Sequence, residues 1–141
     1  MRRLGIDHGM RRVGVAVSDD EGRIAYPRTT LARKDPKALV EAVVALAQEE
    51  GVGEIIVGLP LTLEGRETAS ARRARAFATR VEQSSGLPIV MWDERLTTAA
   101  AERSLATAGV QARKQKAVVD QVAASLILQA YLDMLAARAE R

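Results

Sequence analysis

Short apolar runs separated by glycine and proline dominate the first third of the chain and predict three strands. Residues 4–7 and 13–17 are both largely apolar, and the short glycine-led link at residues 9–12 predicts a hairpin between them. Residues 23–31 are the third predicted strand, in which Pro27 indicates an edge or a bend. The chain is therefore expected to begin with a three-stranded meander.

Helical and extended patterns alternate after this meander. Asp35 followed by Pro36 is typical of a helix start, positions 39, 43, 46 and 47 place apolar side chains on one face, and Gly51 is expected to end this helix. Residues 54–59 are a continuous apolar run, typical of a buried central strand, and residues 61–68 have the composition of a loop.

A second helix is predicted to bury positions 71, 74, 77, 78 and 81 and to stop at Gly86. Residues 87–92 form a fifth predicted strand, and Thr97 or Thr98 is expected to cap a third helix that ends near Gly109. Residues 110–116 are interpreted as a basic linker before a last helix at about 117–139. The positions predicted to face inward on that helix are Val119, Val122, Ala123, Leu126, Ala130 and either Met134 or Leu135.

The predicted order is β-β-β-α-β-α-β-α-α over a single domain, residues 1–141. Three meandering strands followed by two strand–helix units predict an α/β fold with a mixed five-stranded sheet flanked by helices. With 141 residues the chain is long enough for a hydrophobic core of its own.

Composition excludes several kinds of chemistry. The chain has no cysteine and one histidine, so disulfides, thiol nucleophiles, cysteine-based zinc sites and histidine-rich metal sites are ruled out. No uninterrupted apolar run approaches the roughly 18 residues of a membrane span, and the first residues predict a strand rather than a signal peptide. The expectation is a cytoplasmic protein with no membrane partner.

Basic residues are clustered although the net charge is only +3. Four arginines bracket Asp7, five arginines stand against one acid in residues 66–80, and a third cluster lies at residues 113–116. Such clusters suit a polyanion, although for any single cluster a solvated helix face is the alternative. Aromatic residues make up only 3% of the chain, so a nucleic acid would be held through its phosphates and shape rather than by base stacking.

Three carboxylates stand in apolar or tightly turned surroundings. Asp7 ends the first predicted strand, Glu94 ends the last one, and Asp120 begins the last helix. An unpaired buried charge is costly, and a divalent metal is the most economical common partner for three converging carboxylates. The alternatives are a turn-forming Asp7, a surface pair between Glu94 and a nearby arginine, and a first-turn acid favoured by the helix dipole at position 120.

Four motifs resemble the YqgF family, which is also called RuvX. They are Gly5-Ile-Asp7-His-Gly9 with the following Gly14-Val-Ala-Val-Ser18, Val57-Gly58-Leu-Pro60-Leu with Glu64-Gly65, Asp93-Glu94-Arg95-Leu96-Thr97-Thr98, and Lys116 through Asp120-Gln-Val-Ala123-Ala124 to Gln129. The motifs occur in the family's order and span nearly the whole chain. One departure is Thr68, which stands near the place where the family's central loop often has a second glycine.

The resemblance implies a ribonuclease-H-like fold related to the Holliday-junction resolvase RuvC, and a nuclease acting on the 5′ end of pre-16S ribosomal RNA or on branched DNA. By this similarity Asp7, Glu94 and Asp120 are the catalytic and metal-binding carboxylates of a two-ion Mg²⁺ or Mn²⁺ site, with the ions roughly 4 Å apart. A fourth carboxylate is not evident, because strand alternation turns Asp93 away from Glu94. The candidate nucleic-acid contacts are Arg11, Arg12, Arg72, Arg95, Lys114 and Lys116.

Residues that neighbour the three carboxylates or lie in the central loop are expected to have structural roles. His8 is predicted to be a structural histidine on the other face of its strand, and Gly58 and Pro60 are interpreted as loop geometry.

The alternative functions are a sugar-kinase- or actin-like nucleotide-binding domain and a non-catalytic ribosome-assembly factor. RNA and DNA stay equally open as substrates, and cutting a four-way junction would call for a homodimer.

Overall fold

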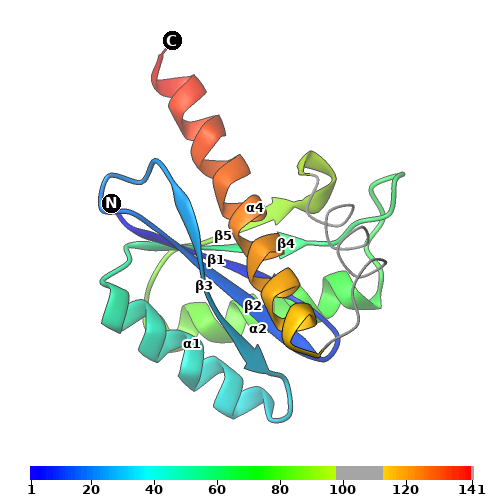
Figure 1. The fold of residues 1–141 in the computed structure, drawn as a ribbon. Coiled ribbons are helices and arrows are strands. Elements are labelled where there is room, and N and C mark those ends of the chain that lie inside the picture. The colour runs from blue at the N-terminus through cyan, green and yellow to red at the C-terminus, as the bar shows by residue number, and fades with distance from the viewer. Residues whose placement is uncertain (98–112, 141) are drawn as a thin grey trace.

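One five-stranded sheet organises the protein, whose computed structural model describes the backbone of residues 1–97 and 113–140 and the side chains of residues 1–97 and 118–140. The strand order is β3-β2-β1-β4-β5, as Figure 1 shows. The strands are β1 (Arg3–His8), β2 (Arg12–Ser18), β3 (Ala25–Ala32), β4 (Glu54–Leu59) and β5 (Ile89–Asp93). A mixed five-stranded α/β sheet was the prediction, and it is confirmed.

The strand pairing places β1 at the centre of the sheet. β1 and β2 are antiparallel and form the predicted hairpin, while β1, β4 and β5 run parallel to one another. β2 and β3 are antiparallel, with an irregularity between Val15 and Ala16. The carboxyl ends of β1, β4 and β5 therefore meet at one edge of the sheet, where ligands collect in open α/β folds.

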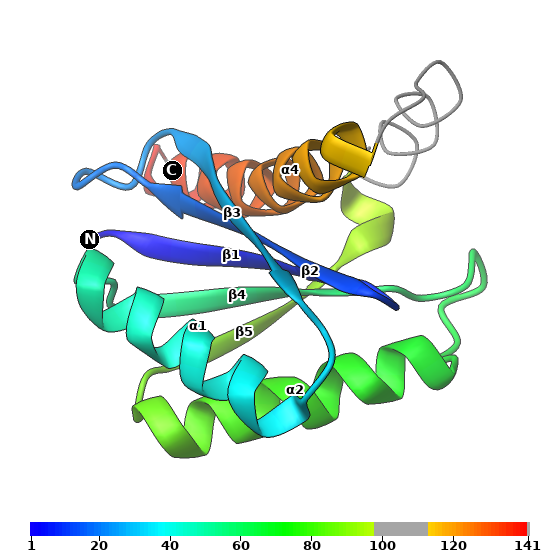
Figure 2. The same cartoon turned by 60° about the horizontal axis from the view of Figure 1, so that its bottom comes forward.

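Helices cover both faces of the sheet, as Figure 2 shows. Helices α1 (Pro36–Glu50) and α2 (Ala69–Ser85) pack on one face, where a core of 15 buried residues includes Ile6, Val57 and Phe77. Helix α4 (Arg113–Ala139) packs on the other face, where Ile56, Ile127 and Leu128 lie in a second buried cluster. The alternation of side chains along the central strands β1, β2 and β4 thus directs their buried residues to one or the other of two cores.

The ends of α1 and α2 follow the sequence signals. The Asp35 side chain accepts a hydrogen bond from the Lys37 amide at 3.1 Å, and Gly51 ends α1 in the left-handed conformation. Thr68, the residue that departs from the family pattern, is the N-cap of α2, and Gly86 ends that helix. A hydroxyl at position 68 therefore has a local structural role.

Three predictions near the C-terminus need correction or fall outside the description. The last helix begins at Arg113, not at 117, because the Arg-Lys-Gln-Lys run interpreted as a linker consists of good helix formers. Val122 is exposed rather than inward, since apolar residues nearly encircle this helix and its periodicity alone does not define the buried face. The third helix predicted after Thr97 or Thr98 lies outside the described residues.

Helix α4 is long and apolar enough over Val118–Ala139 to cross a membrane by length and composition. Its apolar side chains already have a partner in the fold, because Ala124, Ile127, Leu128 and Leu132 are buried against the sheet. Core packing therefore accounts for these four residues, while 39% of the membrane-length window as a whole is buried.

Candidate active site

Asp7 lies near the carboxyl end of the central strand and is a buried acid with 6% of its surface exposed. It sits on the α4 face of the sheet, because its neighbours Ile6 and His8 point to the opposite face. Its partner in β2 is Gly14, and continuing the parallel register of Ile6 with Val57 places Gly58 of β4 on its other side. Two glycines therefore flank Asp7 in the sheet.

The glycine in β2 brings α4 into direct contact with the sheet. A Cβ atom at Gly14 would lie 2.0 Å from the carbonyl oxygen of Asp120, a distance that no side chain could occupy. Asp120 is thereby held next to the strand position opposite Asp7. It lies about two turns into α4, not on the first turn as the sequence suggested, because the helix begins earlier.

The glycine in β4 makes room for Glu94. A Cβ atom at Gly58 would lie 3.2 Å from both Cγ and Cδ of Glu94, so this side chain lies over the glycine. Glu94 itself opens the single-turn helix η1 (Glu94–Leu96) that follows β5. The interpretation of Gly58 as loop geometry is wrong, since it is a strand residue paired with Trp92.

Asp7 and Asp120 line one cavity of about 260 Å³. The hairpin turn supplies the rest of the wall, with the side chains of Met10, Arg11 and Arg12. Arg12 Nε donates a hydrogen bond to Asp120 Oδ2 at 2.7 Å, which forms an ion pair inside the cavity. Two acids and two arginines therefore meet in a small space on the α4 face.

The donor chemistry of this site fits a hard divalent ion, because all three candidate ligands are carboxylates. Within residues 1–97 and the part of α4 whose side chains are described, no three acidic or histidine side chains are close enough together to hold a metal. Asp120 points one oxygen at Arg12, so ion binding would require that carboxylate to exchange a guanidinium for the metal. Among those residues, Asp7 and Asp120 are the acids that line this cavity, and Glu94 does not line it.

Asp93 does not line the cavity, and its carboxylate is paired with Arg95. Strand alternation does not decide its direction relative to Glu94, because β5 ends at Asp93 and Glu94 opens η1. Arg95 Nη2 lies 2.7 Å from Asp93 Oδ2, and Arg95 Nε also donates to this carboxylate. The hydrogen bond from the Arg95 side chain lowers the pKa of the Asp93 carboxyl below its usual range. Arg95 also donates to the carbonyl oxygen of Leu63 at 3.2 Å and so ties the end of β5 to the loop after β4.

The other predicted nucleic-acid contacts are dispersed. Arg11 is exposed at the cavity wall, whereas Arg12 is engaged with Asp120. Arg72 is exposed on α2 and does not line the cavity. Lys114 and Lys116 lie in the first turn of α4, and their side chains fall outside the described set.

His8 points away from the carboxylates into the core on the α1 and α2 side, in agreement with its predicted structural role. Its ring stacks on Phe77 with 4.8 Å between centroids. Burial, aided by the charges of Arg33 and Arg73, lowers the pKa of His8 from 6.5 to about 4. The imidazole is therefore neutral at physiological pH.

Sequence reasoning missed the residues that shape the site without carrying charge. Gly14 and Gly58 provide the space for Asp120 and Glu94, and Arg33 Nη1 donates to the carbonyl oxygens of Gly9 and Met10 at 3.1 Å, which braces the hairpin turn. A glycine inside a strand is a known sign of close backbone approach, and this signal was available at both positions.

Comparison with known proteins places this arrangement in a family. Residues 1–134 match the model of the family RuvX, which is described as Holliday junction resolvase. A Chloroflexus aurantiacus protein named "Putative pre-16S rRNA nuclease" is 46% identical over 130 residues, which cover 92% of this chain and 85% of that protein. A Syntrophus aciditrophicus protein of the same name is 44% identical over 135 residues, covering 96% and 90% of the two chains.

Solved structures with low sequence identity share the fold. RuvC of T. thermophilus, solved in complex with a Holliday junction substrate, superposes with a TM-score of 0.62 at 16% identity and covers 95% of this chain and 96% of its own. The yeast mitochondrial Holliday junction resolvase Ydc2 gives a TM-score of 0.56 at 12% identity, with 95% and 78% of the two chains covered. The ribonuclease-H-like architecture predicted from the motifs is thus confirmed.

Proposed function

The chain belongs to the RuvX family, and we propose that it is a metal-dependent nuclease whose catalytic carboxylates are Asp7, Glu94 and Asp120. The observation that carries this proposal is the pair of glycines beside Asp7. Gly14 admits the backbone of Asp120 and Gly58 admits the side chain of Glu94, so both acids approach the same strand residue. The substrate class is structured nucleic acid, either a ribosomal RNA precursor, as the names of the relatives suggest, or branched DNA.

Each residue of the site has a distinct part in this proposal. Asp7 is fixed by the central strand and would contribute the least mobile ligand, while Asp120 and Glu94 would approach from α4 and from the turn after β5. Bound Mg²⁺ or Mn²⁺ would supply water activation and stabilisation of the leaving oxygen. Arg11, exposed at the cavity wall, would hold a neighbouring phosphate of the substrate.

Arg12 would stay paired with Asp120 when no substrate is present. Its ion pair with Asp120 offsets part of the repulsion between two neighbouring carboxylates. A divalent ion carries more charge and would replace the guanidinium at Asp120. Arg12 would then be free to contact the phosphate backbone, which reconciles its present position with the predicted role in nucleic-acid binding.

The decisive experiment replaces Asp7 with asparagine, which keeps the size of the side chain and removes its charge. We expect cleavage dependent on Mg²⁺ or Mn²⁺ to fall by at least about 10³-fold, comparable with the loss of an essential catalytic group. Asp20→Asn is the matched control, because the Asp20 side chain is 90% exposed and lies outside the cavity. Undiminished cleavage by Asp7→Asn would contradict the proposed site.

Substrate choice is tested by offering a pre-16S ribosomal RNA fragment and a four-way DNA junction in parallel. Cleavage of the junction by paired nicks would require two active sites, and analytical ultracentrifugation with the junction would then reveal a dimer. Binding of either substrate with no cleavage at any divalent-ion concentration would favour a non-catalytic assembly role.

A further inference from the structure

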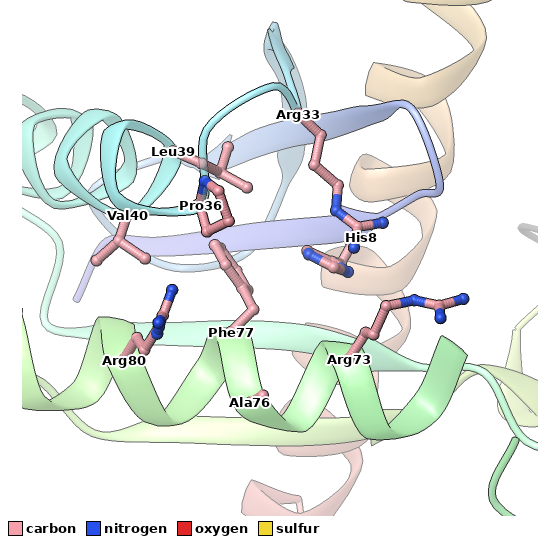
Figure 3. A pocket seen from close by; sticks show the side chains of 9 residues that line it. All are labelled: His8, Arg33, Pro36, Leu39, Val40, Arg73, Ala76, Phe77 and Arg80. Carbon is pink, nitrogen blue, oxygen red and sulfur yellow. The ribbon is translucent and has the colours of Figure 1, made fainter. Parts of the chain in front are cut away.

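A second basic cavity lies on the face of the sheet opposite to the carboxylates, between α1 and α2. Its volume is about 240 Å³, and its lining includes His8, Arg33, Leu39, Arg73, Phe77 and Arg80. Figure 3 shows the guanidinium of Arg33 beside the imidazole of His8, and Phe77 between Arg73 and Arg80 along α2. The active-site cavity shares none of these residues.

The three arginines of this cavity have no carboxylate partner among the described residues. The bonds of Arg33 are made through Nη1 to two backbone carbonyls, and those of Arg73 through Nη2 to Ser70 Oγ and Met10 Sδ. Because a guanidinium has five N–H donors, both groups keep donors for a further acceptor. Arg33 and Arg73 both reach Met10, and neighbouring arginines without a counter-ion are typical of an anion site.

The rest of the cavity is apolar. Leu39 and Phe77 are 4% and 6% exposed and belong to the core on this face of the sheet. The His8 ring, stacked on Phe77, adds a flat surface at the end near Arg33 and Arg73. A simple inorganic anion would leave this apolar surface uncovered, so the lining fits a ligand that has both a phosphate and a ring.

The spacing of the arginines suggests how such a ligand would lie. Arg73 and Arg80 are seven residues apart on α2, which separates their backbones by about 10 Å along the helix. Arg33 and Arg73 can share one phosphate near His8, whereas Arg80 stands at the other end, where a planar ring can stack on a guanidinium. The volume equals that of roughly eight water molecules, so the cavity can enclose the phosphate and part of one nucleoside, and the remainder of the ligand would lie at its open mouth.

We propose that this cavity binds a nucleoside monophosphate, with the phosphate held by Arg33 and Arg73 and the base lying on Leu39 and Phe77 towards Arg80. This inference does not depend on the nuclease function, because the site lies on the opposite face of the sheet and uses none of the three carboxylates. A protein without nuclease activity could still bind the ligand, and an active nuclease could fail to bind it.

The test measures binding of AMP, adenosine and inorganic phosphate to the full chain by calorimetry and NMR. EDTA is present throughout, so that no metal can bridge a phosphate to the carboxylate site. His8 is the only histidine and Phe77 the only phenylalanine in the chain, so their ring resonances report occupancy without ambiguity. We expect saturable shifts of both rings with AMP and at least fivefold weaker binding of adenosine and of phosphate, roughly the loss of one good contact.

The informative variant is Arg73→Gln, since Arg33 also braces the hairpin turn and its removal could disturb the fold. We expect AMP binding to weaken about tenfold, because a charge-assisted contact to phosphate is lost. Arg72→Gln is the matched control, as it removes the same charge from the adjacent, exposed position that does not line this cavity. Its effect should stay below about twofold at 0.15 M salt.

Several outcomes would overturn the proposal. Equal weakening by Arg73→Gln and Arg72→Gln would mean diffuse surface attraction. Phosphate binding as tightly as AMP would mean an anion site without a base subsite, and adenosine binding as tightly would mean that the arginines have no part in recognition. Binding of AMP with no change in the His8 and Phe77 resonances would place the ligand elsewhere.

Discussion

Replacing Gly58 with alanine tests whether the strand glycine creates the place for Glu94. The added methyl group would lie 2.8 Å from Cδ1 of Ile127 and 3.2 Å from Cγ and Cδ of Glu94. The first contact is with the end of a flexible side chain, which can move aside. The second requires the Glu94 side chain to shift by a few tenths of an ångström or to change rotamer.

The stability cost of this change should be modest. An extra methyl in a packed core costs about 1–3 kcal/mol, and the lower end applies where a side-chain terminus can yield. Alanine also lowers the conformational entropy of the unfolded chain. At a position with ordinary strand geometry this stabilises the folded state by about 0.4–1 kcal/mol. The net loss should be near 1 kcal/mol or less, or roughly 3–5 °C in Tm for a chain of this size.

Gly58→Ala should affect the cleavage rate more strongly than the free energy of unfolding. A misplacement of about 1 Å in a catalytic group can reduce a rate about 100-fold, so a smaller shift of Glu94 should lower kcat about tenfold. Metal-dependent cleavage is measured well below the Tm of each variant, beside a thermal unfolding curve monitored by circular dichroism.

Gly5→Ala is the matched control on the same face of the sheet. Its methyl group would lie 2.7 Å from Cβ of Leu128 and 3.1 Å from the carbonyl oxygen of Ala124, so it should destabilise the fold more than Gly58→Ala. It touches neither Glu94 nor Asp7 and should leave the rate of the folded protein within about threefold of the wild type. Wild-type cleavage by Gly58→Ala, or equal losses in both variants, would show that Gly58 does not create the place for Glu94.

Three further predictions concern the neighbours of the site. Gly14→Ala should cost more than about 3 kcal/mol in urea unfolding, because the methyl would meet the Asp120 carbonyl at 2.0 Å and only the whole of α4 can move away. Arg12→Gln should lower the Mg²⁺ concentration for half-maximal cleavage about threefold by removing the competing cation, and weaken substrate binding in gel shifts. His8 has a lower pKa in the folded state than in the unfolded chain, so stability should fall between pH 6.5 and 4, by about 1 kcal/mol after allowance for partial exposure. His8→Phe should flatten this part of the urea-measured pH profile.

Local signals predicted the elements well because each has a short-range cause. The N-cap at Asp35, the stops at Gly51 and Gly86 and the apolar face of α2 depend on residues within a few positions of one another. The predicted first residue of α4 was wrong because a run of good helix formers was interpreted as a linker. The prediction for Val122 was wrong because the buried face is decided by packing against the sheet, which no local pattern carries.

The candidate site, like the fold, could be predicted from the sequence only in part. Motifs predicted three site carboxylates, and this stays a prediction. The partner of Asp120 could not be predicted, because Arg12 lies far away in sequence and meets it only after α4 packs on β2. The role expected for Arg95 in holding nucleic acid is likewise open, as its charge is already engaged by Asp93. Charge alone does not distinguish an arginine that binds substrate from one that holds the fold.

The strand β1 contributes one residue to each of the two cavities. Asp7 points to the α4 face and His8, the next residue, points to the face of α1 and α2. Arg33 braces the turn that follows both residues, through the carbonyls of Gly9 and Met10. A ligand that engages Arg33 on one face therefore acts on the hairpin turn that carries Arg11 and Arg12 on the other. Because the turn is also a wall of the carboxylate cavity, occupancy of the proposed nucleotide site would be expected to affect the position of Arg11 and Arg12.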